Sequence, residues 1–112
     1  MRIETQKYND IVVIQLQGEF TAEAVKSFED SATSALSSPA VSGLVLDMSK
    51  VVQMDSGALE QLVALNEQCR ERTRQLKLAG LDETCEKILE ITRLLPQFDT
   101  YAELTEAVKS FA

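Results

Sequence analysis

The run GLVLDM, residues 43–48, restricts the fold of this chain more than any other stretch. It is almost continuously apolar, which is typical of a central strand that is covered on both faces. A second strand pattern, IVVIQLQ at residues 11–17, lies upstream, and its Val12, Ile14 and Leu16 share one face. A helical pattern separates the two runs. Because a strand–helix–strand crossover joins parallel strands of one sheet, the chain is predicted to be an α/β protein.

The N-terminal part of the chain supplies further elements of this pattern. Residues 2–7 are expected to pair with the first strand through a turn at Tyr8-Asn9-Asp10, because Asn and Asp tolerate turn geometry. Gly18 is expected to end that strand, and Thr21 is a candidate N-cap for the helix that follows. The sequence SSP at residues 37–39 should stop this helix.

The C-terminal half repeats the alternation. Residues 75–79, QLKLA, alternate like a strand, and Asp82 can cap a third helix that carries Leu95 and that Pro96 interrupts. A short edge strand is expected near Gln97 and Phe98. Thr100-Tyr101-Ala102-Glu103 fits a capping box with Thr100 as the cap of the last helix. The chain is therefore predicted to be a single domain, residues 1–112, in which a mixed central β-sheet is covered by about four α-helices.

Composition excludes several classes of chemistry. The chain has no histidine, which excludes a Ser-His-Asp hydrolase and any histidine general base. The glycines form no phosphate-binding motif, and Cys69 and Cys85 lack the usual zinc-ligand spacing, so neither a cofactor nor a metal is expected. Both cysteines are expected to be core thiols in a reducing compartment.

Charge and hydropathy restrict the partners. The formal net charge is −7, which disfavours nucleic acid and anionic lipid because both bind lysine and arginine. No apolar run approaches the roughly 20 residues that cross a bilayer, and the polar start MRIETQKYND does not resemble a signal peptide. The protein is therefore expected in the cytoplasm, without nucleic-acid binding or membrane insertion.

The stretch VVQMDSGALEQLVAL, residues 51–65, places a hydroxyl where a strand gives way to a helix. On physical grounds alone the favoured interpretation is that Ser56 or Gly57 merely begins this helix, because serine is a preferred N-cap. The absence of histidine argues against Ser56 as a catalytic nucleophile, so modification by another protein is the functional interpretation. The helix itself is expected to bury one apolar stripe: Ala58, Leu59, Leu62, Val63, Leu65 and Cys69.

A family resemblance helps to decide whether Ser56 merely begins the helix or is modified by another protein. GLVLDMSKVVQMDSGAL, residues 43–59, resembles the signature of the STAS domain, the anti-sigma factor antagonist family, in which a buried strand is followed by an Asp-Ser turn that opens a helix. IVVIQLQGEF, LKLAGL and ILEITRLLPQFDTYAELTEAV resemble further segments of the family in the same order. The similarity therefore runs over nearly the whole chain.

This resemblance implies a regulatory binding protein and not an enzyme. Family members with a serine in this turn are phosphorylated there by a partner kinase that is also an anti-sigma factor, and a phosphatase removes the phosphate. By position, Ser56 is the phosphoacceptor, and the partner-binding residues are Asp55, Ser56, Gly57, Glu60 and Thr21. Glu60 and Thr21 depart from the family pattern, which leaves recognition by the kinase open. The protein is expected to be a monomer or a weak dimer.

Two other functions remain as alternatives. A STAS domain can be the cytoplasmic accessory subunit of a lipid transporter, in which the same helix face docks on an ATPase. A small enzyme would instead use Asp47 and Asp55 as paired carboxylates, but nothing in the sequence indicates the substrate cleft that it needs.

Overall fold

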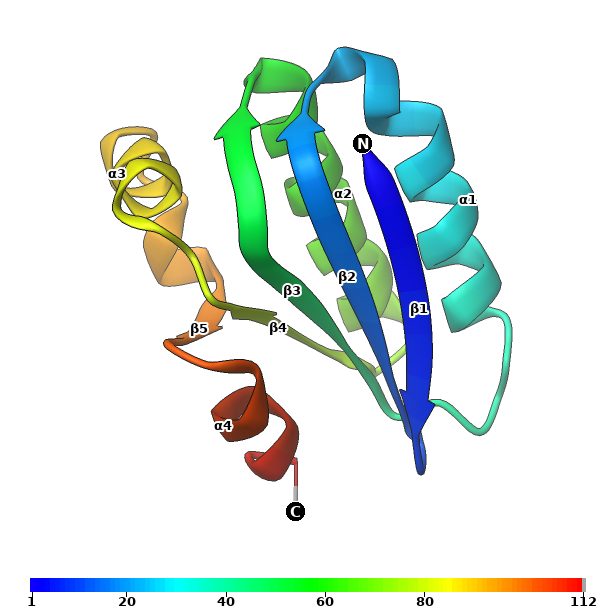
Figure 1. The fold of residues 1–112 in the computed structure, drawn as a ribbon. Helices are drawn as coiled ribbons and strands as arrows, with labels where there is room; N and C mark the ends of the chain where they lie inside the picture. The colour runs from blue at the N-terminus through cyan, green and yellow to red at the C-terminus, as the bar shows by residue number, and fades with distance from the viewer. Residues whose placement is uncertain (112) are drawn as a thin grey trace.

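The computed structural model describes residues 1–111, which form one five-stranded sheet with helices on both faces (Figure 1). The strands lie in chain order: β1 (Arg2–Tyr8), β2 (Ile11–Phe20), β3 (Gly43–Met54), β4 (Gln75–Ala79) and β5 (Asp99–Tyr101). β1 runs antiparallel to β2, and each later pair of neighbours is parallel. The predicted mixed sheet, and the parallel pairing of the two strands around the first helix, are therefore confirmed.

The helical segments alternate with the strands: η1 (Ala22–Ala24), α1 (Val25–Leu36), α2 (Ser56–Glu71), α3 (Glu83–Ile91), η2 (Leu95–Gln97) and α4 (Leu104–Lys109). Figure 1 shows α1 and α2 side by side behind the sheet. Buried residues of α1, α2 and α3 share the larger core with one face of the sheet. Ala107 of α4 packs on the other face, against Ile11, Val13 and Val45. No helix within residues 1–111 is long and apolar enough to cross a bilayer.

The run GLVLDM occupies the first half of β3, and all of its residues are buried. Leu44 and Leu46 belong to the larger core, whereas Val45 belongs to the smaller core beneath α4. Successive side chains of a strand point to opposite faces, so a strand with helices on both sides requires apolar residues at consecutive positions. The interpretation of this run as a central strand is confirmed.

The turn between β1 and β2 is as predicted, with Asn9 in the left-handed region at φ 56°. Gly18 does not end β2, which corrects the sequence prediction. Gly18 has a φ of 105° and lies next to a shift in the register between β2 and β3. β2 continues past this irregularity to Phe20. Glycine adopts such a φ at little cost, so the strand bends here instead of stopping.

α3 ends at Ile91, before the Pro96 that was expected to interrupt it. Arg93 adopts φ 63°, and its N–H donates to the Glu90 carbonyl at 3.0 Å. The Leu94 N–H donates to the Leu89 carbonyl at 2.9 Å. This pair of hydrogen bonds is a Schellman C-cap, which terminates a helix without any proline. Leu95, predicted to belong to this helix, lies in η2 instead.

The last strand and helix also differ from the prediction. β5 occupies Asp99–Tyr101 and not Gln97 and Phe98, because Thr100 pairs in register with Leu78 of β4. Thr100 is therefore a strand residue, and the N-cap position of α4 falls on Glu103. The predicted capping box is wrong, since pairing with β4 takes its first residue into the sheet.

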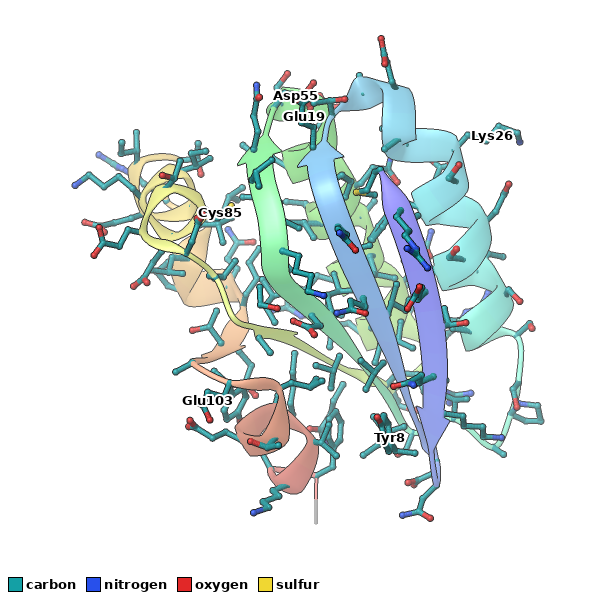
Figure 2. The ribbon with its side chains drawn as sticks, viewed as in Figure 1. Tyr8, Glu19, Lys26, Asp55, Cys85 and Glu103 are labelled. Carbon is teal, nitrogen blue, oxygen red and sulfur yellow. The ribbon has the colours of Figure 1, made fainter. Side chains whose placement is uncertain are left out.

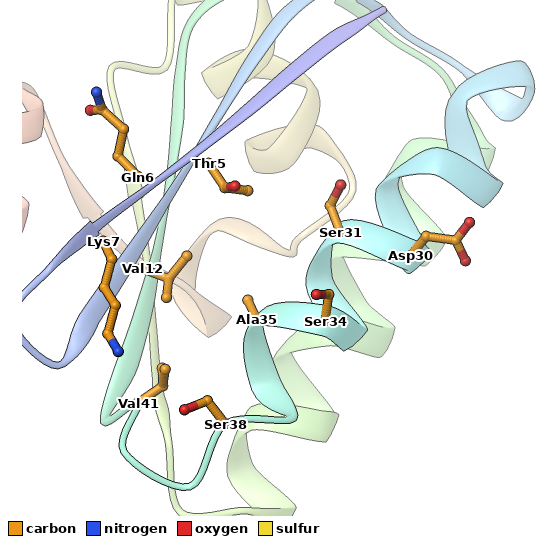
Figure 3. Close-up of a pocket in the computed structure, with 10 residues that line it drawn as sticks. All are labelled: Thr5, Gln6, Lys7, Val12, Asp30, Ser31, Ser34, Ala35, Ser38 and Val41. Atoms are coloured by element: carbon orange, nitrogen blue, oxygen red, sulfur yellow. The ribbon is translucent and has the colours of Figure 1, made fainter.

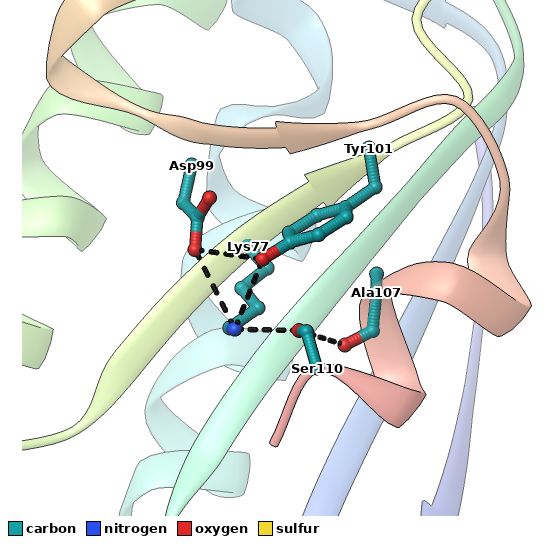
Figure 4. Close-up of polar contacts among 5 residues, drawn as sticks. All are labelled: Lys77, Asp99, Tyr101, Ala107 and Ser110. Atoms are coloured by element: carbon teal, nitrogen blue, oxygen red, sulfur yellow. Dashed lines mark hydrogen bonds and ion pairs between the residues drawn. The ribbon is translucent and has the colours of Figure 1, made fainter. Parts of the chain in front are cut away.

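Lys77 of β4 is a cation with only 4% of its surface exposed, on the face that α4 covers (Figure 4). Its Nζ donates to Ser110 Oγ at 2.5 Å and to Tyr101 Oη at 3.3 Å, and lies 3.5 Å from Asp99 Oδ2. It also lies 4.5 Å from the centre of the Phe111 ring, within the range of a cation–π contact. These contacts tie the C-terminal segment to β4 and β5.

Lys77→Ala should lower the free energy of unfolding by about 1–3 kcal/mol, because it removes a packed aliphatic stem and leaves two hydroxyls without their donor. Urea unfolding followed by circular dichroism measures the difference. The matched control is Lys109→Ala, since Lys109 is exposed on α4. Equal unfolding midpoints for the two variants would contradict a structural role for the buried ammonium group.

Candidate functional site

The Asp-Ser turn lies where β3 gives way to α2, beside the carboxyl end of β2. The Asp55 N–H donates to the Phe20 carbonyl at 3.3 Å, and Glu19 and Phe20 pair with Gln53 and Met54 of β3. Figure 2 shows Asp55 next to Glu19 at this edge of the sheet. Because parallel strands end at the same edge, the turn meets the start of η1, which lies 33 residues earlier in the chain.

The carboxylate of Asp55 caps two helical segments at once. Its Oδ1 accepts a hydrogen bond from the Ala58 N–H at 3.0 Å, at the start of α2. Its Oδ2 accepts one from the Ala22 N–H at 3.0 Å, at the start of η1. These hydrogen bonds, first that from Ala22 and then that from Ala58, hold the pKa of Asp55 below its ordinary value. Asp55 therefore sets the position of η1 relative to α2.

This geometry confirms one part of the prediction for the turn and corrects another. α2 begins at Ser56, as expected, but its N-cap is Asp55 and not the serine. Thr21 occupies the N-cap position of η1, but within residues 1–111 its side chain makes no capping hydrogen bond. The Asp55 carboxylate takes that role as well. The side chain of Ser56 is exposed, and the fold does not use its hydroxyl as the cap.

Gly57 permits the close approach of these two segments. A Cβ atom at this position would lie 3.1 Å from both the Cα and the Cβ of Ala22, and 3.3 Å from Asp55 Oδ1. Those distances are shorter than ordinary carbon contacts, so a side chain here would push η1 away from the start of α2. The role that the geometry supports for Gly57 is steric.

The surface around Ser56 is acidic. Glu60 is exposed one helical turn along α2. Glu19 and Glu23 are exposed at the adjoining end of β2 and in η1, and they line a small cleft of about 220 Å³ together with the half-buried Thr21. The turn, η1 and the start of α2 thus bring the predicted site residues to one end of the molecule.

Asp47 and Asp55 do not form a carboxylate pair. Asp47 is buried, and its Oδ1 accepts hydrogen bonds from the N–H of Ser49 at 3.1 Å and the Oγ of Ser49 at 2.8 Å. The two aspartates are separated by eight residues of largely extended chain, or roughly 25 Å at about 3.3 Å per residue. The geometry does not supply the acid–base pair that the enzyme alternative requires.

A cleft of about 520 Å³ lies between β1 and α1 (Figure 3). Thr5 and Lys7 of β1 face Ser31 and Ser34 of α1 across it. Its lining within the described residues contains none of the predicted site residues and a single carboxylate, Asp30. This cleft is therefore separate from the site around Ser56.

Metal ligands and reactive thiols are not features of the described chain. No group of three or more cysteine, aspartate or glutamate residues that could hold a metal ion occurs within residues 1–111. Cys69 and Cys85 are buried free thiols, as predicted. Burial raises the pKa of Cys69 to about 11 and that of Cys85 to about 12, so neither thiolate forms readily at neutral pH.

Leu59 and Val63, which lie on the predicted apolar stripe of α2, pack against the edge of the larger core and are only partly buried. The structure buries the remaining members of that stripe and leaves Leu59 and Val63 half-buried at the surface. The predicted apolar stripe is wider than a single buried helix face requires. This extra width is the signal in the sequence for an apolar surface at Leu59 and Val63. These two side chains extend an apolar surface along α2 from the first turn of the helix.

Comparison with known proteins identifies the family and supports the fold. The sequence model of the STAS domain matches residues 2–107. A candidate anti-sigma factor antagonist from Thermotoga maritima has a TM-score of 0.88 at 20% identity, over 96% of this chain and 92% of that one. The Bacillus cell fate determinant SpoIIAA in its phosphorylated form has a TM-score of 0.78 at 20% identity, over 99% and 100%. A sulfate transporter family protein from Wolinella succinogenes has a TM-score of 0.81 at 14% identity, over 90% and 84%.

Asp55→Asn should destabilise the protein at neutral pH, because an amide cannot accept both hydrogen bonds through oxygen. A carboxyl whose pKa is lower in the folded state contributes stability that is complete above its ordinary pKa of about 3.9 and is lost as the pH falls through the folded value. The difference in free energy of unfolding between the wild type and the variant should therefore shrink as the pH falls below about 4. Urea unfolding over a pH series measures it. Asp30→Asn, at an exposed aspartate, is the control, and a difference independent of pH would contradict the double cap.

Proposed function

The chain belongs to the STAS domain family, and from this premise we propose that it is a regulatory binding protein of the anti-sigma factor antagonist type. In the proposed cycle, a partner that is both an anti-sigma factor and a serine kinase binds the unmodified protein and transfers a phosphoryl group to Ser56. The phosphorylated protein then leaves the partner, and a phosphatase restores the serine. In this proposal the chain catalyses no reaction itself, takes no cofactor and acts in the cytoplasm, where sigma factors work.

The observation that carries this proposal is the division of roles between Asp55 and Ser56. Asp55 takes the capping role, while Ser56 is exposed at the first position of α2. A hydroxyl that faces solvent and is not the cap is accessible to the active site of another protein. The phosphorylated form of SpoIIAA supports the idea that this fold accepts a phosphate, since that protein shares the fold at a TM-score of 0.78.

The start of α2 is a favourable place for a phosphate. The group adds a charge of about −1.5 to −2 at neutral pH. The N–H groups of the first turn and the positive end of the helix dipole favour an anion there, and the Asp55 carboxylate already accepts the Ala58 N–H at this helix start. Phosphorylation is therefore expected to leave the protein folded and to act on the complex with the partner.

In this proposal, repulsion between phosphate groups on the two proteins releases the partner. A kinase that phosphorylates Ser56 must hold the phosphates of its nucleotide against this serine. After the transfer, the phosphoserine faces the phosphates of the ADP that remains, and like charges in a desolvated interface repel strongly. Exposed Glu19, Glu23 and Glu60 increase the negative charge on this side of the interface.

The proposed docking residues divide into two groups. Asp55 and Gly57 shape the surface, because the Asp55 carboxylate is committed to backbone N–H groups and Gly57 allows Ala22 to approach. Glu60 lies one turn along α2 from Ser56, and the half-buried Thr21 precedes η1 beside the turn; these two positions depart from the family pattern. Those two side chains are therefore where selection among related kinases is expected.

A second candidate function is an accessory subunit that docks on the ATPase of a lipid transport system. It is favoured by the likeness to a sulfate transporter family protein from Wolinella succinogenes, which places the same fold in a transport context. Here the same end of the molecule would contact the ATPase, and phosphorylation of Ser56 would not be required. A stable complex with a transport ATPase that is indifferent to Ser56 would favour this candidate.

Ser56→Asp should weaken binding to the nucleotide-loaded anti-sigma factor kinase by roughly tenfold or more, since it puts a permanent anion at the phosphorylation position. Ser56→Ala should bind as the wild type does and should carry no phosphate. Isothermal titration calorimetry measures the affinities, and intact-mass spectrometry of protein purified from its own cells detects the phosphate.

Ser34→Asp provides the matched control, because Ser34 is an exposed serine beside the cleft between β1 and α1. It should leave the affinity for the kinase unchanged. Equal affinities of the Ser56→Ala and Ser56→Asp variants would overturn the proposed switch.

A further inference from the structure

An open apolar groove runs along α2 from its first turn. Its volume is about 320 Å³. Three side chains of α2 and one that follows α3 make its apolar lining, and two glutamates are its charged residues. The complete lining is Leu59, Glu60, Val63, Ala64, Glu67 and Leu94.

The far wall of this groove is held by specific hydrogen bonds. Leu94 is positioned by the Schellman C-cap of α3, through the hydrogen bond of its N–H to the Leu89 carbonyl at 2.9 Å. Asn66 Nδ2 of α2 donates to the Gln97 carbonyl of η2 at 3.3 Å. These contacts set the spacing between α2 and the segment after α3, so the groove is formed before any partner arrives.

The charge of the groove indicates what it binds. Glu60 and Glu67 are both exposed, and no lysine or arginine lines the groove within the described residues. A basic partner therefore gains from both carboxylates, whereas an acidic one is repelled. A second copy of this chain is disfavoured, because its net charge is −7 and an isologous contact would bring the same glutamates together.

The dimensions match a helix. Leu59 and Val63 are four residues apart on α2 and present neighbouring side chains. From Leu59 to Glu67 the groove extends about 12 Å along the helix axis at 1.5 Å per residue. That length accommodates about two turns of a partner helix, whose apolar side chains repeat at similar spacing.

We propose that this groove receives a short basic amphipathic helix of the partner, with aliphatic side chains between Leu59, Val63 and Leu94 and lysine or arginine side chains against Glu60 and Glu67. This inference rests on the proposed function, because it assigns part of the same partner interface. The groove supplies affinity in both phosphorylation states, and Ser56 supplies the switch. Ser56 lies seven residues from Val63, or about 10 Å along the helix, but Glu60 is only four residues from it, so the switch adjoins one end of the groove.

The test uses a helix-stapled peptide of about 16 residues, with leucines at i and i+4 and lysines beside them. It is titrated into methyl-labelled full-length protein, and the methyl resonances of Leu59, Val63 and Leu94 are followed by NMR. These resonances should shift with a common dissociation constant. A matched peptide with glutamates in place of the lysines should bind roughly tenfold more weakly.

Variants separate apolar from charged contributions. Val63→Ser should weaken peptide binding roughly fivefold to tenfold, whereas Ile91→Ser, at a residue that is 68% exposed on α3, should not change it. Glu60→Gln and Glu67→Gln should each weaken it roughly twofold to fivefold at low salt, and Glu106→Gln on α4 should not. Ser56→Asp should not weaken peptide binding, because the peptide carries no nucleotide.

The inference would be overturned by no shift of the groove methyls at millimolar peptide, by equal binding of the lysine and glutamate peptides, or by shifts centred elsewhere. Concentration-dependent shifts of the same methyls without peptide would assign the groove to a second copy and would also overturn it. Failure of the proposed function is a separate outcome. It appears as an affinity for the kinase that is indifferent to Ser56→Asp while the peptide still occupies the groove.

Discussion

The bridge from the Asp55 carboxylate to two helix starts is the contact on which the functional end of this molecule depends. One oxygen accepts the Ala58 N–H and the other accepts the Ala22 N–H, so a single side chain sets the positions of α2 and η1. Both helix starts carry N–H groups that lack partners within their own segment, and a carboxylate is the strongest acceptor available for them. Gly57 makes the bridge possible, because a Cβ atom there would crowd Ala22.

This bridge gives the capping role to Asp55 and leaves the neighbouring Ser56 free for the regulatory role that we propose. Since Asp55 caps α2, Ser56 carries an exposed hydroxyl whose chemistry can change without removing the cap. In the proposed function, that separation allows a phosphate to alter a partner complex while the protein stays folded. The proposed groove along α2 adds a second separation of roles. Its side chains would supply affinity for the partner, whereas Ser56 on the same helix would supply the switch. Lys77 and α4 lie on the opposite face of the sheet, away from these surfaces.

The sequence predicted the features that local patterns encode. Alternation in β2 and the continuous apolar run in β3 indicated parallel central strands, and the Asp-Ser turn indicated the site. Asp82 was expected to cap α3, and its Oδ1 accepts the Cys85 N–H at 2.7 Å. The sequence predictions were wrong mainly where a local sequence signal competed with pairing to a segment distant in the chain. Thr100 fits a capping box by spacing, yet pairing with β4 makes it a strand residue.

By itself, therefore, the sequence determined the order of strands and helices, the mixed sheet and the position of the candidate serine, because hydrophobic periodicity and turn chemistry act over a few residues. The tertiary structure alone decided that Asp55 is the cap, that it also reaches Ala22, and that Leu59 and Val63 are only partly buried at the edge of the core. The physical reason is the distance in sequence that separates the groups in contact. A carboxylate can cap any helix start that the sheet brings beside it, and only the packed sheet pairs β2 with β3 in parallel so that their carboxyl ends meet at the same edge.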